Sequence, residues 1–283
     1  MSTLTADPAT PGSPDTSRPS RPRPVYKVTG PRVLRAEWAK TWSLRSTWIT
    51  LGVAVLLLVA AGLLGASNYS PSGTGRGPGA DAKDAVGVAL GGIGFAQLAI
   101  GVLGVLIAGG EYSTGMIRST LAAVPKRLPV LWSKAAVFGA VALAVATVGA
   151  FASFLAGQHF LSGDAIALQL SSSGVVRSLL GAGVFLALVG VLGVALGALV
   201  RSVAGGIGLL VAVMMLLGVL TGLLPSSLGN DISPYLPGNA GGSIYALHQA
   251  SNTLSPGAGL AVFAGWVALA LAGAAWRLKR SDA

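Results

Sequence analysis

The chain has 283 residues, of which 53% are hydrophobic and only 10% are charged, and its formal net charge at pH 7 is +10. A soluble chain carries roughly 25% charged residues, so this composition excludes an ordinary water-soluble domain. The absence of cysteine also excludes disulfides, thiolate chemistry and cysteine-based zinc sites.

Residues 1–30 are expected to form a disordered cytoplasmic tail. The segment is rich in proline, serine, threonine and arginine, and it has no apolar face to bury. A cleaved secretory signal would have its apolar region near the start, whereas the first apolar run here begins at Trp48. We therefore expect the first apolar helix to be retained.

Residues 31–47 are predicted to form an amphipathic helix at the membrane surface. Pro31 suits a first helical position, and Leu34, Trp38 and Trp42 recur every four residues on one face. Two interpretations are open: a helix that lies along the inner leaflet, or an ordinary basic flank with tryptophans at headgroup depth.

A membrane domain is predicted over residues 48–280, with six apolar stretches that lack acidic and basic residues. Each stretch is close to the ~20 residues that a helix needs to cross a bilayer. They cover residues 48–66, 86–110, 135–161, 179–200, 203–224 and 259–276. Since none shows the polar alternation of barrel strands, the predicted fold class is all-α, a polytopic membrane protein with six transmembrane helices.

The fourth and fifth stretches are separated only by Arg201 and Ser202. A single helix over both would be about twice as long as a bilayer is thick, so a tight hairpin is favoured.

The distribution of positive charge predicts the orientation. Near the spans, twelve Lys and Arg residues fall on the side that carries both termini and three fall on the other side. Positive residues favour the cytoplasmic side, so both termini are expected to be cytoplasmic in a multi-pass protein of the cell membrane. The same cations would face anionic lipid, which makes membrane lipid the expected partner and nucleic acid an unexpected one.

The motifs of catalysis and metal binding are missing. The chain has no Gly-Lys dipeptide and hence no phosphate-binding Walker A loop. Its two histidines, His159 and His248, lie far apart, so no metal site and no catalytic residue is predicted. The apolar stretches also lack Asp, Glu, Lys and Arg, which proton-coupled carriers usually place within their spans.

The segment from Glu111 to Lys134 is predicted to be a short cytoplasmic helix pair with a docking surface. Glu111 and Arg118 are seven residues apart, which on a continuous helix places them on one face, although Gly115 lies between them. A contact that holds the docking helix, made within the loop or with a partner, is one interpretation of this pair. The other is that both are ordinary interfacial charges.

This segment resembles the motif that follows the second span in ABC-2 type permeases of bacterial ATP-binding-cassette exporters. The matching residues here are Glu111, Tyr112, Gly115, Arg118, Leu121, Pro125 with Arg127, and Lys134. The resemblance extends to six spans, cytoplasmic ends, an amphipathic helix before the first span and a long outer connection before the last. It implies the ABC-2 (type V) exporter architecture, and it implies that these eight residues couple the chain to an ATPase.

In that family the permease carries no ATPase domain. The resemblance therefore implies a non-enzymatic permease subunit, two copies of a separate ATPase subunit that holds ATP and magnesium, and a second permease subunit, here a homodimer. The cargo is expected to be hydrophobic or amphipathic and to be exported. Residues 225–258 would form short re-entrant helices, and a plain outer loop is the alternative. The competing functions are an ATP-independent carrier or channel, and a membrane-anchored structural or interaction protein.

Overall fold

The computed structural model describes residues 29–71, 74–80, 82–124, 127–223 and 225–280. Within these ranges the chain is helical and contains no strand. Most of the tail that was predicted to be disordered lies outside the described residues. The predicted coupling residue Pro125 also lies outside them. The helices are α1 (Gly30–Ser43), α2 (Arg45–Ser67), α3 (Ala85–Ala89), α4 (Ile93–Ser113), α5 (Met116–Ala123), α6 (Leu128–Leu161), α7 (Val175–Val200), α8 (Val203–Val211), a π-helical segment (Ala212–Leu216), α9 (Leu217–Thr221), α10 (Ser226–Ile232), a 3₁₀ turn (Ser233–Tyr235), α11 (Pro237–Tyr245) and α12 (Pro256–Arg280).

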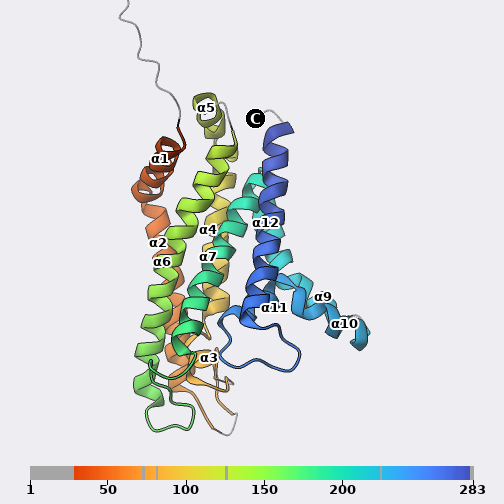
Figure 1. Ribbon diagram of the computed structural model, residues 1–283. Coiled ribbons are helices and arrows are strands. Elements are labelled where there is room, and N and C mark those ends of the chain that lie inside the picture. The colour runs from red at the N-terminus through yellow and green to blue at the C-terminus, as the bar shows by residue number, and fades with distance from the viewer. Residues whose placement is uncertain (1–28, 72–73, 81, 125–126, 224, 281–283) are drawn as a thin grey trace, which may run out of the picture.

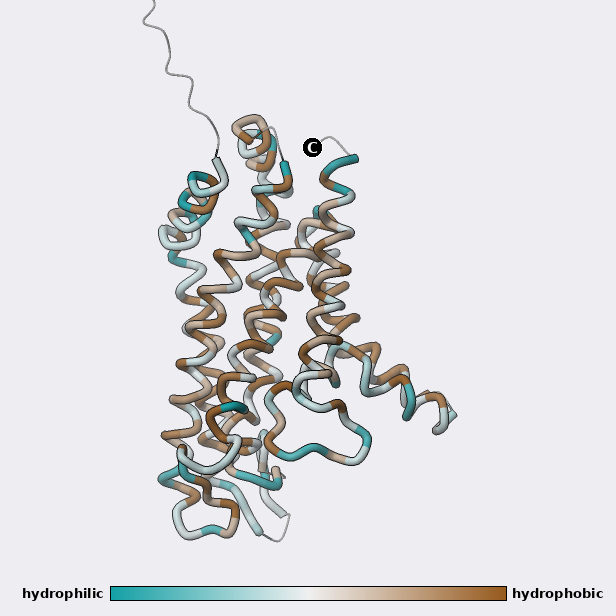
Figure 2. Tube along the Cα trace, viewed as in Figure 1, coloured by the Kyte–Doolittle hydropathy of each residue, from teal (hydrophilic) through white to brown (hydrophobic). Residues whose placement is uncertain are grey.

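Six helical spans of the described chain are long and apolar enough to cross a membrane, which confirms the predicted number. They are α2, α4, α6, α7, the continuous run from α8 to α9, and α12. Figure 2 shows their mainly hydrophobic colouring, with hydrophilic residues gathered at the two ends of the bundle. These properties are those of a multi-pass membrane protein.

The beginning of α1 and the end of α12 lie at the same end of the bundle, at the top of Figure 1. We call this the α1 end; it also carries α5 and the turn between α7 and α8. The other end carries α3, α11 and the long connections. Six crossings place both described ends on one side, as an even number requires.

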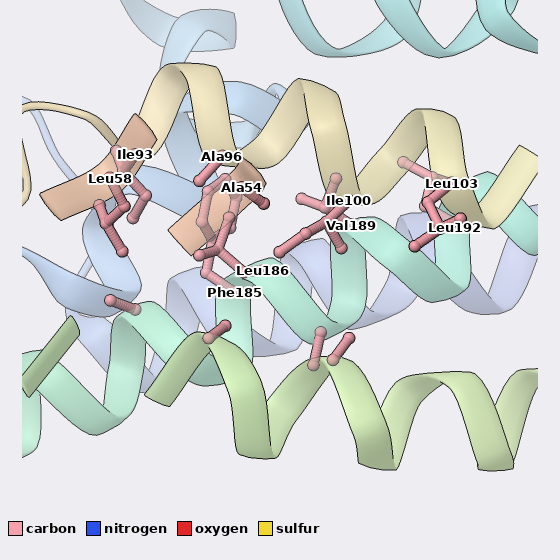
Figure 3. Packing of buried hydrophobic residues seen from close by; sticks show 14 of the residues in the cluster. Ala54, Leu58, Ile93, Ala96, Ile100, Leu103, Phe185, Leu186, Val189 and Leu192 are labelled. Carbon is pink, nitrogen blue, oxygen red and sulfur yellow. The ribbon is translucent and has the colours of Figure 1, made fainter. Parts of the chain in front are cut away.

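The core of the bundle is centred on α4 and α7. Figure 3 shows buried side chains of α2, α4 and α7 packed together, among them Leu58, Ile100, Phe185 and Leu192. Glycines let α4 and α7 approach closely: a Cβ atom on Gly193 would come within 3.0 Å of the carbonyl oxygen of Gly101. Backbone therefore faces backbone along this pair of helices.

The second expected span, 86–110, is divided in the structure. Asp84 caps α3 by accepting a hydrogen bond from the Gly87 amide at 2.8 Å, and α4 starts only at Ile93. Ser153 of α6 donates to the Ala89 carbonyl at 2.7 Å, which satisfies an acceptor at the end of the short helix. Hydropathy alone does not reveal this break, because α3 is as apolar as the span that follows.

The chain turns sharply between α7 and α8, as the hairpin prediction requires. Arg201 ends α7 in the left-handed region with φ of 61°, and Ser202 caps α8 by accepting from the Gly205 amide at 3.3 Å. Gly206 of α8 lies beside Gly197 of α7, so the two helices run antiparallel in contact.

The long connection before α12 contains helices instead of a plain loop. Arg177 at the start of α7 donates to the carbonyl of Ala246 at 2.7 Å, and Tyr245 packs against Phe185 with ring centroids 5.4 Å apart. These contacts hold the end of α11 against α7.

Cysteine labelling tests the number of crossings, and the absence of native cysteine removes background. Ser171→Cys and Ser251→Cys, both exposed opposite the α1 end, should react with an impermeant maleimide in intact cells. Ala122→Cys, exposed on α5, should react only after permeabilisation. If Ala122→Cys and Ser171→Cys both reacted in intact cells, or both only after permeabilisation, the six-span arrangement would be contradicted.

Candidate functional site

Four charged side chains meet at the α1 end and form what we call the ion cluster: Glu37, Lys40, Glu111 and Lys134. Glu37 and Lys40 belong to α1, Glu111 to the last turns of α4, and Lys134 to the second turn of α6. The cluster thus joins three helices that are far apart in sequence. Its formal charge is zero, because it holds two acids and two bases.

Lys134 lies between the two glutamates. Its Nζ donates to Glu37 Oε2 and to Glu111 Oε1, each at 2.8 Å. Lys40 makes a second bridge, with Nζ at 3.0 Å from Glu37 Oε1 and 3.1 Å from Glu111 Oε1. Each lysine therefore contacts both acids, so the loss of one side chain affects every other member of the cluster.

The cluster is buried except at Lys40. Only 5% of each glutamate side chain and 7% of the Lys134 side chain is accessible, against 35% for Lys40. Isolated charges at this depth would be unstable, and paired and hydrogen-bonded charges are the usual solution. The burial of Lys134 also explains why α6 begins at Leu128, seven residues before the expected start of the span at 135: ion pairing lets the apolar helix continue past a lysine.

The pKa values of Glu37 and Lys40, the two members of the cluster on α1, are shifted from their ordinary values. Burial by itself would raise the pKa of the Glu37 carboxyl, but Lys134, and then Lys40, hold that pKa below its ordinary value of 4.5 through charge and hydrogen bonds. Burial would lower the pKa of Lys40, yet its hydrogen bonds to Glu37 and Glu111 and their charges raise it above 10.5. Both groups are charged at neutral pH, so α1 is held by ion pairs under those conditions.

The sequence of α1 separates two faces. Val33, Glu37 and Thr41 are buried against the bundle, and the Thr41 hydroxyl donates to the Glu37 carbonyl at 3.0 Å. The predicted stripe of Leu34, Trp38 and Trp42, which lies about 100° further round the helix, is exposed. Trp38 and Trp42 stack with ring centroids 5.9 Å apart. An exposed apolar stripe beside a set of membrane spans is typical of a helix at the lipid surface.

Glu111 has one oxygen, Oε2, that is buried without a hydrogen bond among the described residues. Glu111, Ile117, Leu121 and Leu278 line a cavity of about 20 Å³, which has room for one water molecule. Glu111 is therefore the member of the cluster with the least complete hydrogen bonding.

A contact between Glu111 and Arg118 within the loop, one of the interpretations that the sequence left open, is not formed. Gly115 takes the left-handed conformation with φ of 73° and ends the helical path after α4, so the two residues are not on one continuous helix. Arg118 is exposed on α5, and the described residues place no acidic side chain at ion-pair distance from it. Glu111 is paired across the bundle instead.

The remaining predicted coupling residues surround the cluster. Leu121 is buried under α5, and the Tyr112 ring lies under the Arg201 guanidinium at 5.3 Å from its centroid. Arg127, at the start of α6, donates to the carbonyl of Leu278 in α12 at 3.5 Å. The structure therefore brings Glu111, Tyr112, Leu121 and Lys134 together and places Arg118 away from them.

Two members of the cluster, Glu37 and Lys40, are absent from the set predicted from sequence. One signal was available: Glu37 is the only acidic residue between Asp15 and Asp81. It also lies on the Val33–Thr41 face, beside the tryptophan stripe and not within it. A lone acid on the inward face of a basic amphipathic helix indicates a buried ion pair.

The cluster holds two acids and two bases in contact at one end of the bundle. The described residues contain no group of three or more His, Asp or Glu side chains that could bind a metal ion. Of the two histidines, His248 contacts Asp84 at the opposite end, with Nδ1 and Oδ2 3.1 Å apart. The cluster can fix the position of α1 relative to α4 and α6, and it can transmit a displacement among them.

A scan against protein-family models and a search of curated proteins both find no match to this chain.

Proposed function

We propose that this chain is the membrane-spanning permease subunit of an exporter of the ABC-2 type, powered by ATP that a separate subunit hydrolyses. The observation that carries the proposal is the position of the ion cluster. Glu111 is two residues from the end of α4, and α5, the expected docking helix, follows directly. A displacement of α5 by a partner would pull on Glu111 and, through Lys134 and Lys40, on α6 and α1.

The exposure of α5 supports its role as a docking element. Ile117 and Leu121 face the bundle, whereas Met116, Arg118 and Ser119 are exposed. The α1 end is the cytoplasmic end in this proposal, in accordance with the excess of Lys and Arg there. An ATPase subunit in the cytoplasm would then reach α5 directly.

A second copy of the chain completes the proposal. The span from α8 to α9 is the least buried of the six, with Leu216 and Val219 among its exposed residues. Lipid or a second permease subunit would cover that surface. The cargo class stays hydrophobic or amphipathic, since the pathway would be lined by apolar side chains.

Co-expression with an ATP-binding subunit encoded beside this gene tests the proposed function. The purified chain alone should hydrolyse no ATP, and efflux of an amphipathic dye should appear only with the partner. Glu111→Gln should abolish most of the efflux at unchanged membrane level, while Asp231→Asn, an exposed acid at the opposite end, should leave it unchanged. Efflux by the chain alone, driven by a proton gradient, would contradict the proposal and favour a secondary carrier.

A further inference from the structure

An apolar groove lies between α1 and α5, next to the ion cluster. Its volume is about 460 Å³, within the range of small-ligand sites. Val33 and Ala36 of α1 form one wall, Met116 and Ala123 of α5 form the other, and Val130 of α6 closes the floor. Figure 1 shows α1 and α5 as separate helices at the same end of the bundle.

The groove leaves one side of α5 without protein support. Ile117 and Leu121 are buried on the bundle side of this helix, and α5 packs chiefly against the end of α4. The side with Met116 and Ala123 lines the groove. An apolar wall open to water would be unfavourable, so a ligand with an apolar part would stabilise α5 in its place.

The rim of the groove is positively charged. Arg32 and Lys40 both line it, and the one acid there, Glu37, has each of its carboxylate oxygens bound to a lysine. Lys40 Nζ donates two hydrogen bonds, to Glu37 and Glu111, and an ammonium group has three protons to donate. Its side chain is 35% exposed, so one further donor is available for an anion at the rim.

The depth of the groove matches a lipid headgroup. The neighbouring face of α1 is the exposed stripe of Leu34, Trp38 and Trp42, and tryptophans prefer the boundary between headgroups and acyl chains. The groove face of the same helix therefore lies at that boundary too. An occupant with a phosphate at the rim and a hydrocarbon chain between the walls satisfies both the charge and the apolar lining.

We propose that the groove between α1 and α5 binds one anionic phospholipid from the leaflet on which α1 lies. Its phosphate contacts Lys40 and Arg32, and the first part of one acyl chain packs between Ala36 and Ala123. The bound lipid then fixes the distance between α5 and α1. The proposal requires that the chain is embedded in a membrane; it does not require an ATPase partner.

Native mass spectrometry of the full chain, released from detergent with added lipid, tests the proposal. The probes are phosphatidylglycerol and phosphatidylcholine with identical acyl chains. Wild-type chain should retain one phosphatidylglycerol molecule in preference to phosphatidylcholine. Ala36→Phe, which places a ring in the groove, should reduce that retention by at least about tenfold. Ala39→Phe is the matched control, because Ala39 is an exposed alanine of the same helix outside the groove. This variant should retain phosphatidylglycerol as well as the wild-type chain does.

A second pair of variants tests the headgroup contact. Arg32→Gln should weaken retention of phosphatidylglycerol by about fivefold, which corresponds to the roughly 1 kcal/mol that one cation contributes at an anionic lipid surface. Arg35→Gln, on the same helix but outside the groove, should have a smaller effect. Equal retention of the two lipids by wild type would overturn the proposal, as would full retention by Ala36→Phe. Displacement of the bound lipid by millimolar inorganic phosphate would also overturn it, because it would show an anion site without a role for the acyl chain.

Discussion

Lys134→Met is expected to lower the thermal unfolding midpoint of the purified chain in detergent by roughly 6–20 °C. Lys134 is the buried cation that donates to both glutamates, so its removal leaves Glu37 Oε2 without a partner and the cluster with excess negative charge. The loss of one partner from a buried ion pair typically costs about 3–5 kcal/mol. In a chain of this size each kcal/mol corresponds to roughly 2–4 °C.

Lys279→Met is the matched control, because Lys279 is exposed near the end of α12 and forms no ion pair with the described residues. It should shift the midpoint by little. Adding Glu37→Gln to Lys134→Met restores the formal neutrality of the cluster and should recover part of the lost stability. Equal midpoints for Lys134→Met and Lys279→Met would show that the cluster does not stabilise the bundle.

Gly193→Ala is expected to reduce the yield of folded protein severely. The new Cβ atom would come within 3.0 Å of the Gly101 carbonyl oxygen, and its other neighbours, Gly101 C and Val105 N at 3.1 Å, are backbone atoms as well. Backbone atoms in packed helices cannot rotate away as a side chain can, so the cost should lie at or above the upper end of the ~1–3 kcal/mol typical of overpacking. Size-exclusion chromatography with fluorescence detection, together with the thermal midpoint, measures the effect.

Gly218→Ala provides the comparison, since a Cβ atom at position 218 meets nothing within 4 Å. Both substitutions gain the same ~1 kcal/mol of helix propensity, so the difference between them isolates the steric cost. Identical yield and midpoint for the two variants would be incompatible with the close approach of α4 and α7.

The number of spans could be predicted from sequence because bilayer thickness imposes a length and charges mark the ends. The hairpin at Arg201 is a local feature and was also predicted. The division of the second stretch was not, since α3 ends at Ala89, whose carbonyl accepts a hydrogen bond from Ser153, a residue of α6 that is 64 positions away in sequence.

The candidate site was only partly predictable for the same reason. Glu111 and Lys134 were identified through a local motif, but their partners on α1 are up to 97 residues distant in sequence. A contact of Glu111 with Arg118 within the loop was one of the interpretations that local spacing left open, and the structure pairs Glu111 with Lys40 and Lys134 instead. Long-range ion pairs depend on how the helices assemble, and hydropathy and charge spacing carry no information on that.

The close backbone contact of α4 with α7 restricts how this protein can change shape. Where a glycine of one helix faces a carbonyl of the other, as Gly193 faces Gly101 and Gly104 faces Gly190, sliding by one residue would drive a side chain into the opposite main chain. The two helices therefore move as one rigid body. Any passage through the membrane has to open elsewhere, and the span from α8 to α9, with its π-helical segment at Ala212–Leu216 and few buried residues, is the least constrained part of the bundle.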